Sequence, residues 1–514
     1  MWPTTERRLG STSLPICRAM VVALGIAAGA TMMPVTGHAQ AIRRQLDSIL
    51  DVPPFNRQLW GVALVDEQGK LLYGRNEDRL FIPASNTKLL ATTVASALFS
   101  PDWTVKTSLY ANGQQVNGVL EGDLVLYGRG DPTFSNRCYD LDTMKTGACD
   151  RDIFARFRTM ALALKARGIS SVSGDLVGDG SYFDPQMVHP GWENYDLSWW
   201  YAAPVSGLFL NDNSVDFTWG PGPAAGTPAV FSISPQLGDF TFENRTKTES
   251  GGSDNLDVYR DLASMRIRAE GDVALTSHGG TESVSMPDPN LFAARALRVA
   301  LAEAGIAVLG TTRSTVDSND YRVIRSQPAL AEVESRPLRD WIFPILNTSQ
   351  NTFAEYLVKQ LGRIFGKGGS WDEGISVERR FLIDSVKIDS TQFNVQDGSG
   401  LASNNLVSPL AFTQMIRFIR HHPNWATFAA GFPHSGQPGS LRTRFIRTPL
   451  EGRVWAKTGS ISRVNTLSGF FETTSGRRYY FSVQANHHTL PTRLILGQID
   501  SVVVAMGKLV DRRH

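Results

Sequence analysis

Apolar runs near both ends of the chain predict strands that pair as hairpins. Residues 61–65 and 71–73 are largely apolar and flank a short polar turn. Residues 466–473 and 478–484 do the same around a turn that contains Gly476. Short strands joined by a compact polar turn are typical of β-hairpins. We therefore expect one hairpin near each end of the chain.

Apolar residues that recur every three or four positions predict several helices. One begins at or next to Ser85, and others cover residues 153–167, 291–304 and 352–361. The last helix carries an apolar stripe made of Ile495, Ile499, Val502, Val503, Met506 and Val510. We expect this stripe to pack on a sheet, with contact to a membrane surface as the alternative.

A long middle segment differs in texture from both ends. Residues 105–335 contain short runs of β-forming residues, many glycines and many turns. This pattern predicts a separate β-rich insert with one clear helix at 153–167. The helix at 291–304 begins a more helical stretch of the chain.

Length and composition indicate a folded protein of more than one domain. Of the 514 residues, 42% are hydrophobic and 19% are charged. Disordered chains carry fewer apolar and more charged residues, so this class is excluded. The length also exceeds what one ordinary hydrophobic core contains.

The N-terminus has the three parts of a secretory signal peptide. Three arginines precede an apolar stretch over residues 19–33, and Gly37-His38-Ala39 follows as a small-residue cleavage pattern. This order predicts a signal peptide at residues 1–39 and export to the periplasm. An uncleaved N-terminal anchor is the alternative, although the stretch is short for a membrane span.

Loss of the signal peptide changes the charge balance and the cysteine count. It removes three arginines and Glu6, so the formal net charge falls from +2 to 0. No basic surplus remains, which argues against a nucleic-acid partner. The remaining cysteines are Cys138 and Cys149. In an oxidising compartment we expect them to form a disulfide, with two free thiols as the alternative.

Ser85 and Lys88 place a hydroxyl and an amine three residues apart, on one face of a predicted helix. A serine nucleophile needs a base nearby, and a lysine acts as one only when its surroundings lower its pKa. The pair therefore suits nucleophilic catalysis. Taken alone, it is more simply a capping serine and a solvated lysine.

Two further motifs follow in order along the chain. Ser349 and Asn351 lie just before a predicted helix, where their side chains can point into one cleft or simply cap the helix. The run Lys457-Thr458-Gly459-Ser460 precedes the last hairpin, which indicates an edge strand facing a cleft. Its glycine lets a substrate backbone approach closely, and its lysine and threonine suit a carboxylate.

The order Ser-x-x-Lys, Ser-x-Asn and Lys-Thr-Gly matches the motifs of active-site-serine enzymes that recognise penicillin. The chain resembles the class C low-molecular-mass penicillin-binding proteins, which are D-Ala-D-Ala carboxypeptidases and endopeptidases. Residues 128–133, Gly-Arg-Gly-Asp-Pro-Thr, resemble the family's Gly-Gly-Asp-Pro-Thr segment. Residues 397–401 resemble its Asp-Gly-Ser-Gly-Leu element, and the long segment between Ser85 and Ser349 fits the same group.

The resemblance implies an α+β fold with a penicillin-binding, transpeptidase-like domain, an antiparallel sheet flanked by helices. Residues 40–104 and 336–514 form this domain, and residues 105–335 are the large β-rich insert. The implied substrates are peptidoglycan muropeptides, with β-lactam antibiotics as inhibitors. Neither a cofactor nor a metal is implied.

The resemblance also implies the catalytic roles. Ser85 attacks the carbonyl between two D-alanines, with Lys88 as the base for acylation. Ser349 and Asn351 relay a proton and orient the peptide amide. Water then hydrolyses the acyl-enzyme, and a β-lactam acylates the same serine.

Substrate binding is implied for the third motif. Lys457 and Thr458 bind the terminal carboxylate, and the backbone N–H groups of Ser85 and Ser460 form the oxyanion hole. Asp196, from the insert, either holds a substrate ammonium or is a solvated loop residue.

Some positions depart from the family's pattern. Gln350 stands where aspartate is frequent, Ser403 and Asn404 where a basic residue is frequent, and Ser462 where glutamine is expected. We interpret these positions as bearing on recognition of the peptide side chain. Two rival functions remain open, a β-lactamase with fast deacylation and a cell-wall scaffold without turnover.

Overall fold

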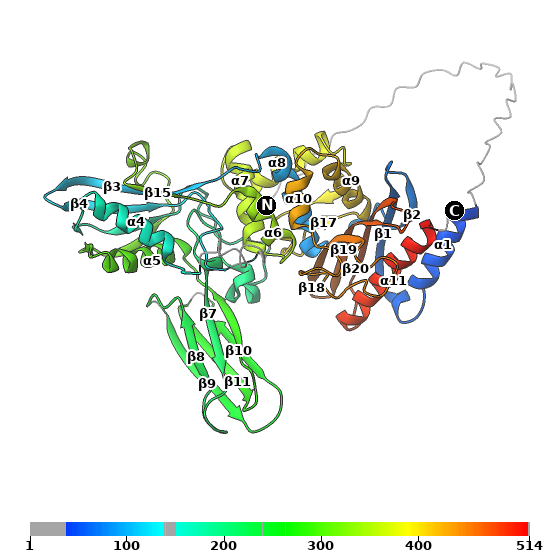
Figure 1. Cartoon of the computed structure of the whole chain (residues 1–514), viewed down its shortest axis with the longest axis horizontal. Helices are drawn as coiled ribbons and strands as arrows, with labels where there is room; N and C mark the ends of the chain where they lie inside the picture. Colours follow the sequence, from blue (N-terminus) through cyan, green and yellow to red (C-terminus); the bar gives the residue numbers. More distant parts are fainter. Residues whose placement is uncertain (1–36, 138, 140–150, 239, 263, 512–514) are drawn as a thin grey trace, which may run out of the picture.

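The two ends of the chain meet in one five-stranded antiparallel sheet in this computed structural model (Figure 1). The structure describes residues 37–137, 139, 151–238, 240–262 and 264–511. The strand order is β18 (Val454–Ile461), β19 (Val464–Glu472), β20 (Arg478–Asn486), β1 (Leu59–Asp66) and β2 (Leu71–Arg75). Both predicted hairpins are confirmed, and β1 pairs directly with β20, with Leu64 opposite Phe481.

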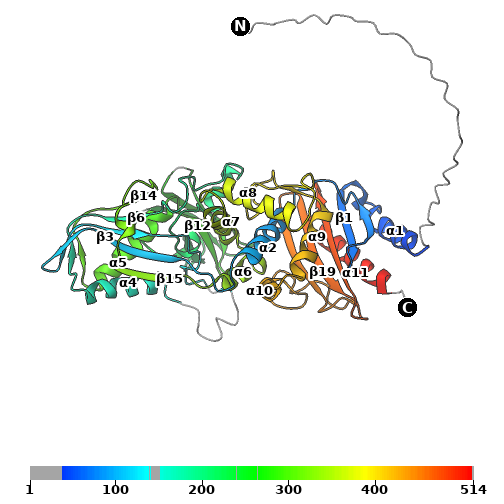
Figure 2. The same ribbon diagram turned by 90° about the horizontal axis from the view of Figure 1, so that it is seen from above.

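Helices cover both faces of this sheet (Figure 2). One face carries α1 (Gly37–Leu50) and α11 (Thr492–Asp511). The helices on the other side are α2 (Lys88–Leu98), α6 (Leu338–Leu346), α7 (Asn351–Phe365), α8 (Trp371–Asp384), α9 (Pro409–Arg420) and α10 (Trp425–Gly431). All of β20 after its first residue is buried. Because both faces of the sheet are covered, even the polar residues Ser482, Gln484 and Asn486 of β20 are buried.

The last helix packs on the sheet, as its apolar stripe predicted. The six stripe residues of α11 are all buried in one cluster with the sheet. α1 adds Ile42, Leu46 and Leu50 to the same cluster. This layer closes the face of the sheet that lies away from α2 and α7.

The insert contains a seven-stranded sheet covered by two helices. Its strands are β3 (Lys106–Val116), β4 (Val119–Tyr127), β5 (Ser171–Val172), β6 (Leu176–Asp179), β13 (Ala307–Val308), β14 (Thr312–Thr315) and β15 (Ala331–Glu334). The helices are α4 (Ala155–Ala166) and α5 (Pro289–Glu303). The helix predicted at residues 291–304 is confirmed as α5, and it packs on α4, β6 and β14 within the insert, so the described part of the insert contains at least two helices and not the one clear helix expected.

Two three-stranded sheets form a second unit within the insert, which projects downward in Figure 1. They consist of β7 (Ser214–Gly220), β8 (Val230–Ser234) and β12 (Gly280–Ser285), and of β9 (Thr241–Glu249), β10 (Asn255–Arg260) and β11 (Arg266–Ala274). Phe217 and Phe242 meet between the two sheets, with ring centroids 5.2 Å apart. Outside these sheets, the short pieces include η1 (Phe55–Arg57), η6 (Ile324–Ser326), β16 (Phe393–Asn394) and β17 (Leu406–Val407).

One continuous hydrophobic core joins the insert to the helices beside the sheet. It includes Leu89 of α2, Leu357 of α7, Leu124 of β4 and Val215 of β7. The α+β fold with a β-rich insert is therefore as predicted, but the insert shares its core with the helices beside the five-stranded sheet.

Two sequence-based expectations lie outside the described residues. Cys138 and Cys149 belong to segments that the structure does not describe, and so does the signal peptide up to residue 36. Within the described ranges, no helix combines the length and the apolarity needed to cross a bilayer.

Leu46→Ala should weaken the layer formed by α1 and α11. Leu46 is fully buried, so truncation leaves a cavity that we expect to lower the free energy of unfolding by about 2–5 kcal/mol. Urea unfolding followed by circular dichroism measures this loss. Gln45→Ala, one residue away on the exposed side of the same helix, is the control. Equal stability of the two variants would contradict this packing.

Candidate active site

Residues from all three motifs line one cavity of about 440 Å³. Ser85, Asn351 and Ser460 are the motif residues in its wall. The insert contributes Glu193, Asp196 and Tyr201, and the other lining residues are Ile82, Gly400, Leu401, Ser403, Ile461 and Ser462. The cavity therefore lies where the five-stranded sheet, the helices and the insert meet.

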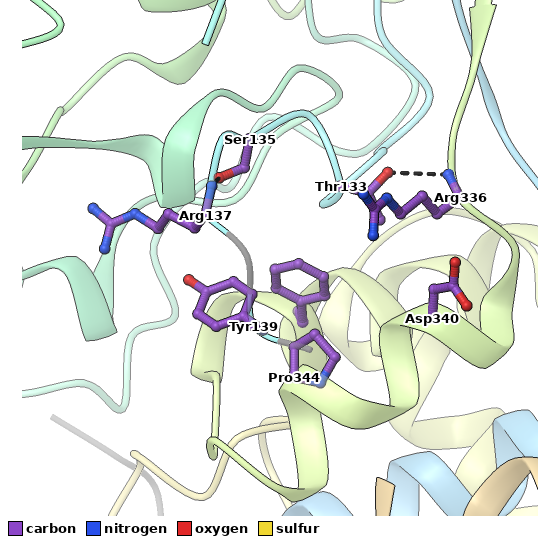
Figure 3. A pocket seen from close by; sticks show the side chains of 8 residues that line it. Thr133, Ser135, Arg137, Tyr139, Arg336, Asp340 and Pro344 are labelled. Atoms are coloured by element: carbon purple, nitrogen blue, oxygen red, sulfur yellow. Dashed lines mark hydrogen bonds between the residues drawn. The ribbon is translucent and has the colours of Figure 1, made fainter. Parts of the chain in front are cut away.

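A second, much smaller pocket of about 40 Å³ lies between the insert and α6, and it contains none of the predicted site residues. Figure 3 shows Arg137 and Tyr139 of the insert on one side and Asp340 and Pro344 of α6 on the other. The chemistry of the three motifs belongs to the larger cavity.

Ser85 lies in the short 3-10 helix η2 (Ala84–Thr87), directly before α2. It is half-buried, whereas its neighbours Ala84 and Asn86 are fully buried. Ala84 has φ of 48°, a left-handed conformation that is costly for a residue with a side chain. The Asn86 amide donates to Ser468 Oγ of β19 at 2.8 Å, which ties this turn to the sheet.

The Lys88 amine is fully buried and has three contacts. Nζ lies 2.9 Å from Ser85 Oγ, 2.7 Å from Asn351 Oδ1 and 2.8 Å from the Ser399 carbonyl oxygen. A neutral amine has two N–H bonds and one lone pair, and the two carbonyl oxygens can only accept. In that state both N–H groups donate to Asn351 and Ser399, and the lone pair faces the Ser85 hydroxyl.

Burial lowers the pKa of Lys88 to about 7, because the charged form loses its hydration. The carboxylates of Glu355 and Asp397 act in the opposite direction. The three described groups that contact Nζ are nevertheless uncharged: one hydroxyl and two carbonyl oxygens. A substantial fraction of the amine is therefore neutral near pH 7.

Ser349 and Lys457 form the second contact between motifs. Lys457 Nζ donates to Ser349 Oγ at 2.8 Å and to the Thr458 carbonyl at 2.9 Å. Burial and the nearby charge of Lys88 hold the pKa of Lys457 well below its usual range. Ser349 itself has φ of 65°, again in the left-handed region.

The third motif lies on β18, the edge strand of the sheet, as expected. Thr458 is half-buried and Ser460 is exposed. A Cβ atom on Gly459 would lie 2.6 Å from the carbonyl oxygen of Pro83 and 2.2 Å from Thr466 Oγ1. Glycine at this position therefore allows the edge strand to approach the turn that carries Ser85.

Asp196 reaches the cavity from η3 (Asn194–Ser198) of the insert. The Tyr201 hydroxyl donates to Asp196 Oδ1 at 3.0 Å. Burial raises the pKa of Asp196, and its hydrogen bond with Tyr201 acts against that rise. The insert thus places a carboxyl group in the wall opposite the sheet.

Three contributors to the site were not predicted. The Tyr201 carbonyl accepts from Asn351 Nδ2 at 2.8 Å, and the Ser399 carbonyl accepts from Lys88. Glu355 accepts from the backbone N–H groups of Gly398 at 2.9 Å and Ser399 at 2.7 Å. Glu355 left a signal, because it lies four residues after Asn351, on the same face of α7. Ser399 lies in the Asp-Gly-Ser-Gly-Leu element at residues 397–401, whereas the Tyr201 carbonyl left no signal.

One interpretation of the departures from the family's pattern is wrong. Gln350 is 3% exposed and does not line the cavity, because its side chain points into the insert. Ser403 and Ser462 do line the cavity, where they can contact a substrate.

Comparison with known proteins agrees with this architecture. The D-Ala-D-Ala carboxypeptidase 3 (S13) family matches residues 42–504. A D-alanyl-D-alanine carboxypeptidase from Actinomadura sp. is 29% identical over 480 residues, which cover 91% of this chain and 84% of the relative. The carboxypeptidase DacB from Haemophilus influenzae is 24% identical over 423 residues, 80% of this chain and 82% of the relative.

Solved structures show the same fold. Penicillin-binding protein 4 (DacB) from Haemophilus influenzae superposes with a TM-score of 0.75 at 22% identity, over 89% of this chain and 98% of the other. The same protein in complex with a β-lactam gives a TM-score of 0.69 at 20% identity, over 90% and 99%. Because the family match extends over nearly the whole described chain, this protein belongs to the D-Ala-D-Ala carboxypeptidase 3 (S13) family and is a serine-type D-Ala-D-Ala carboxypeptidase.

Proposed function

We propose that Ser85 is the nucleophile of this enzyme and that Lys88 is the base that activates it. The observation that carries the proposal is the set of three contacts at Lys88 Nζ, which directs a lone pair of the neutral amine at Ser85 Oγ. In the acylation step, the Ser85 proton passes to Lys88 while Oγ bonds to the carbonyl carbon between two D-alanines. The terminal D-alanine leaves with a proton, and water hydrolyses the ester.

The other motif residues have supporting roles in this proposal. Ser349 and Asn351 relay the proton toward the leaving amine and orient the peptide. Lys457 and Thr458 bind the terminal carboxylate, whose negative charge favours the charged form of the buried Lys457. The backbone N–H groups of Ser85 and Ser460 stabilise the oxyanion, a contribution of roughly 3 kcal/mol per donor.

The substrate in this proposal is a peptidoglycan peptide. The Asp196 carboxylate binds an ammonium group on a side chain of that peptide. Support comes from the position of Asp196 in the cavity wall and from its carboxyl chemistry. The β-lactam complex of the Haemophilus relative supports acylation by the same class of inhibitor here. Export by a signal peptide at residues 1–39, location in the periplasm and a disulfide between Cys138 and Cys149 complete the proposal, on the evidence of the sequence.

Benzylpenicillin should form a covalent adduct on Ser85 that persists for minutes, because a slow deacylation step separates this class from β-lactamases. Intact mass and peptide mapping detect the penicilloyl group, and Ser85→Ala should show none. Rapid loss of the adduct with antibiotic turnover would favour a β-lactamase. An adduct on another residue, or no adduct, would contradict the assigned nucleophile.

The rate of acylation should rise with pH and reach half of its plateau near pH 7. Only the neutral Lys88 amine accepts a proton, so the active fraction grows as the pH rises through its pKa of about 7 and is lost below it. Stopped-flow acylation by a chromogenic cephalosporin between pH 5 and 9 measures this profile. A rate that stays constant down to pH 5 would exclude Lys88 as the base.

Gly459→Ala should slow acylation by about 10²-fold, because the added methyl group separates β18 from the turn that carries Ser85. The second-order rate constant with benzylpenicillin is the measurement. Gly497→Ala adds the same methyl group on α11, where nothing lies within 4 Å, and should acylate like the wild type. Similar rates for both variants would show that the close approach at Gly459 is not needed.

A further inference from the structure

The side chain of Gln350, the middle residue between Ser349 and Asn351, bonds to the insert. Gln350 Nε2 donates to Asp212 Oδ2 at 3.1 Å and also donates to the Tyr139 hydroxyl. Its backbone N–H donates to the Pro344 carbonyl at 2.9 Å. Gln350 is therefore fixed at its backbone by α6 and at its side chain by the insert.

Asp212 is a fully buried carboxylate at the centre of this contact. Oδ2 accepts from Gln350 and from the Tyr139 hydroxyl, and it pairs with Arg137 Nε at 3.3 Å. Figure 3 shows the Tyr139 ring next to Pro344 of α6, with Arg137 extending away on the insert side. Because burying an unpaired charge is costly, these partners keep Asp212 in one position.

The backbone around Asp212 is held in an uncommon conformation. Asn211, Asp212 and Asn213, which form η5, have φ values of 51°, 56° and 50°. Three successive left-handed residues persist only where the surrounding structure fixes them. The Asn213 amide donates to the Tyr356 hydroxyl of α7 at 3.3 Å, so the same turn contacts α7 at a second point.

The insert also contacts Asn351 directly. Asn351 Nδ2 donates to the Tyr201 carbonyl at 2.8 Å, which leaves Oδ1 to accept from Lys88 at 2.7 Å. The reverse orientation of the amide would place N–H groups against Lys88 and an oxygen against a carbonyl. The insert thus determines which atom of Asn351 faces the lysine.

We propose that Asp212 and Gln350 are positioning residues, through which the insert fixes Ser349 and Asn351 for catalysis. This inference rests on the proposed function of these two residues. The Ser349 side chain accepts from Lys457, and its backbone continues into that of Gln350, which α6 and the insert hold in place. The contacts of Gln350 therefore maintain the left-handed φ of 65° at Ser349. The insert is then a structural part of the active site and not only a neighbour of the cleft.

Gln350→Met tests the proposal, because methionine has a similar length and cannot donate to Asp212. We expect acylation by benzylpenicillin to slow by about 10²-fold, as small displacements of catalytic groups do. For D-alanine release, kcat should fall while KM changes little, because the carboxylate contacts of Lys457 and Thr458 remain.

Gln360→Met is the matched control. Gln360 lies on α7 and is buried, as Gln350 is. Its amide donates to the insert, to the carbonyl oxygens of Arg129 at 2.6 Å and Gly130 at 3.2 Å. It lies nine residues beyond Asn351, away from the motif. The melting temperature of Gln360→Met should fall by about as much as that of Gln350→Met. Its acylation rate should equal that of the wild type. Equal acylation rates in the two variants would overturn the proposal.

Asp212→Asn decides the question if Gln350→Met does not fold. It keeps an acceptor for Gln350 and removes the charge that pairs with Arg137, so we expect a smaller loss of kcat in the same direction. A wild-type kcat in a folded Asp212→Asn protein would then overturn the proposal. Failure of wild-type protein to acylate on Ser85 would instead refute the proposed function, which separates the two outcomes.

Discussion

A lysine amine that is buried and contacts only uncharged groups is the arrangement on which the proposed active site depends. Lys88 Nζ contacts a hydroxyl and two carbonyl oxygens, and each comes from a different part of the chain. Ser85 comes from the turn before α2, Asn351 from the start of α7 and Ser399 from the loop after α8. An amine in this position is neutral near pH 7 only while water stays out, so packing around α2 and α7 is part of the chemistry.

α7 connects this amine to the rest of the molecule. Asn351 accepts a hydrogen bond directly from Lys88. Glu355 accepts from the backbone N–H of Ser399, whose carbonyl oxygen contacts Lys88. Tyr356 and Lys359 on the same helix bond to the insert, the latter to Asp184 at 2.6 Å. One helix therefore connects the proposed catalytic centre, the Asp-Gly-Ser-Gly loop and the insert. These parts also share one hydrophobic core, which is consistent with this connection.

Short motifs and periodic patterns were enough to predict much of this arrangement. The strands of the two terminal hairpins, the packing of α11 and the edge position of Lys457 follow from local patterns of apolar residues and turns. The sequence could not predict that Gln350 bonds to Asp212, because the two residues are 138 positions apart and neither belongs to a repeated pattern. Tyr201 and Ser399 contribute backbone carbonyls, which every residue has, so residue type could not show these contacts even though Ser399 lies in the recognised element at residues 397–401. Periodicity predicted the helix at residues 291–304 but not its packing partners, because an apolar face does not show which sheet covers it.

The central claim is that the buried Lys88 amine loses its proton near pH 7 in the folded enzyme, so that a substantial fraction of it is neutral there. The most direct test is an NMR titration of protein labelled with ¹³Cε-lysine, with Lys88→Arg used to assign the resonance. The account predicts that the Lys88 signal titrates with a midpoint near pH 7, far below the pKa of about 10.4 that is usual for a solvent-exposed lysine. A Lys88 signal that stays in the charged position up to pH 10 would contradict it.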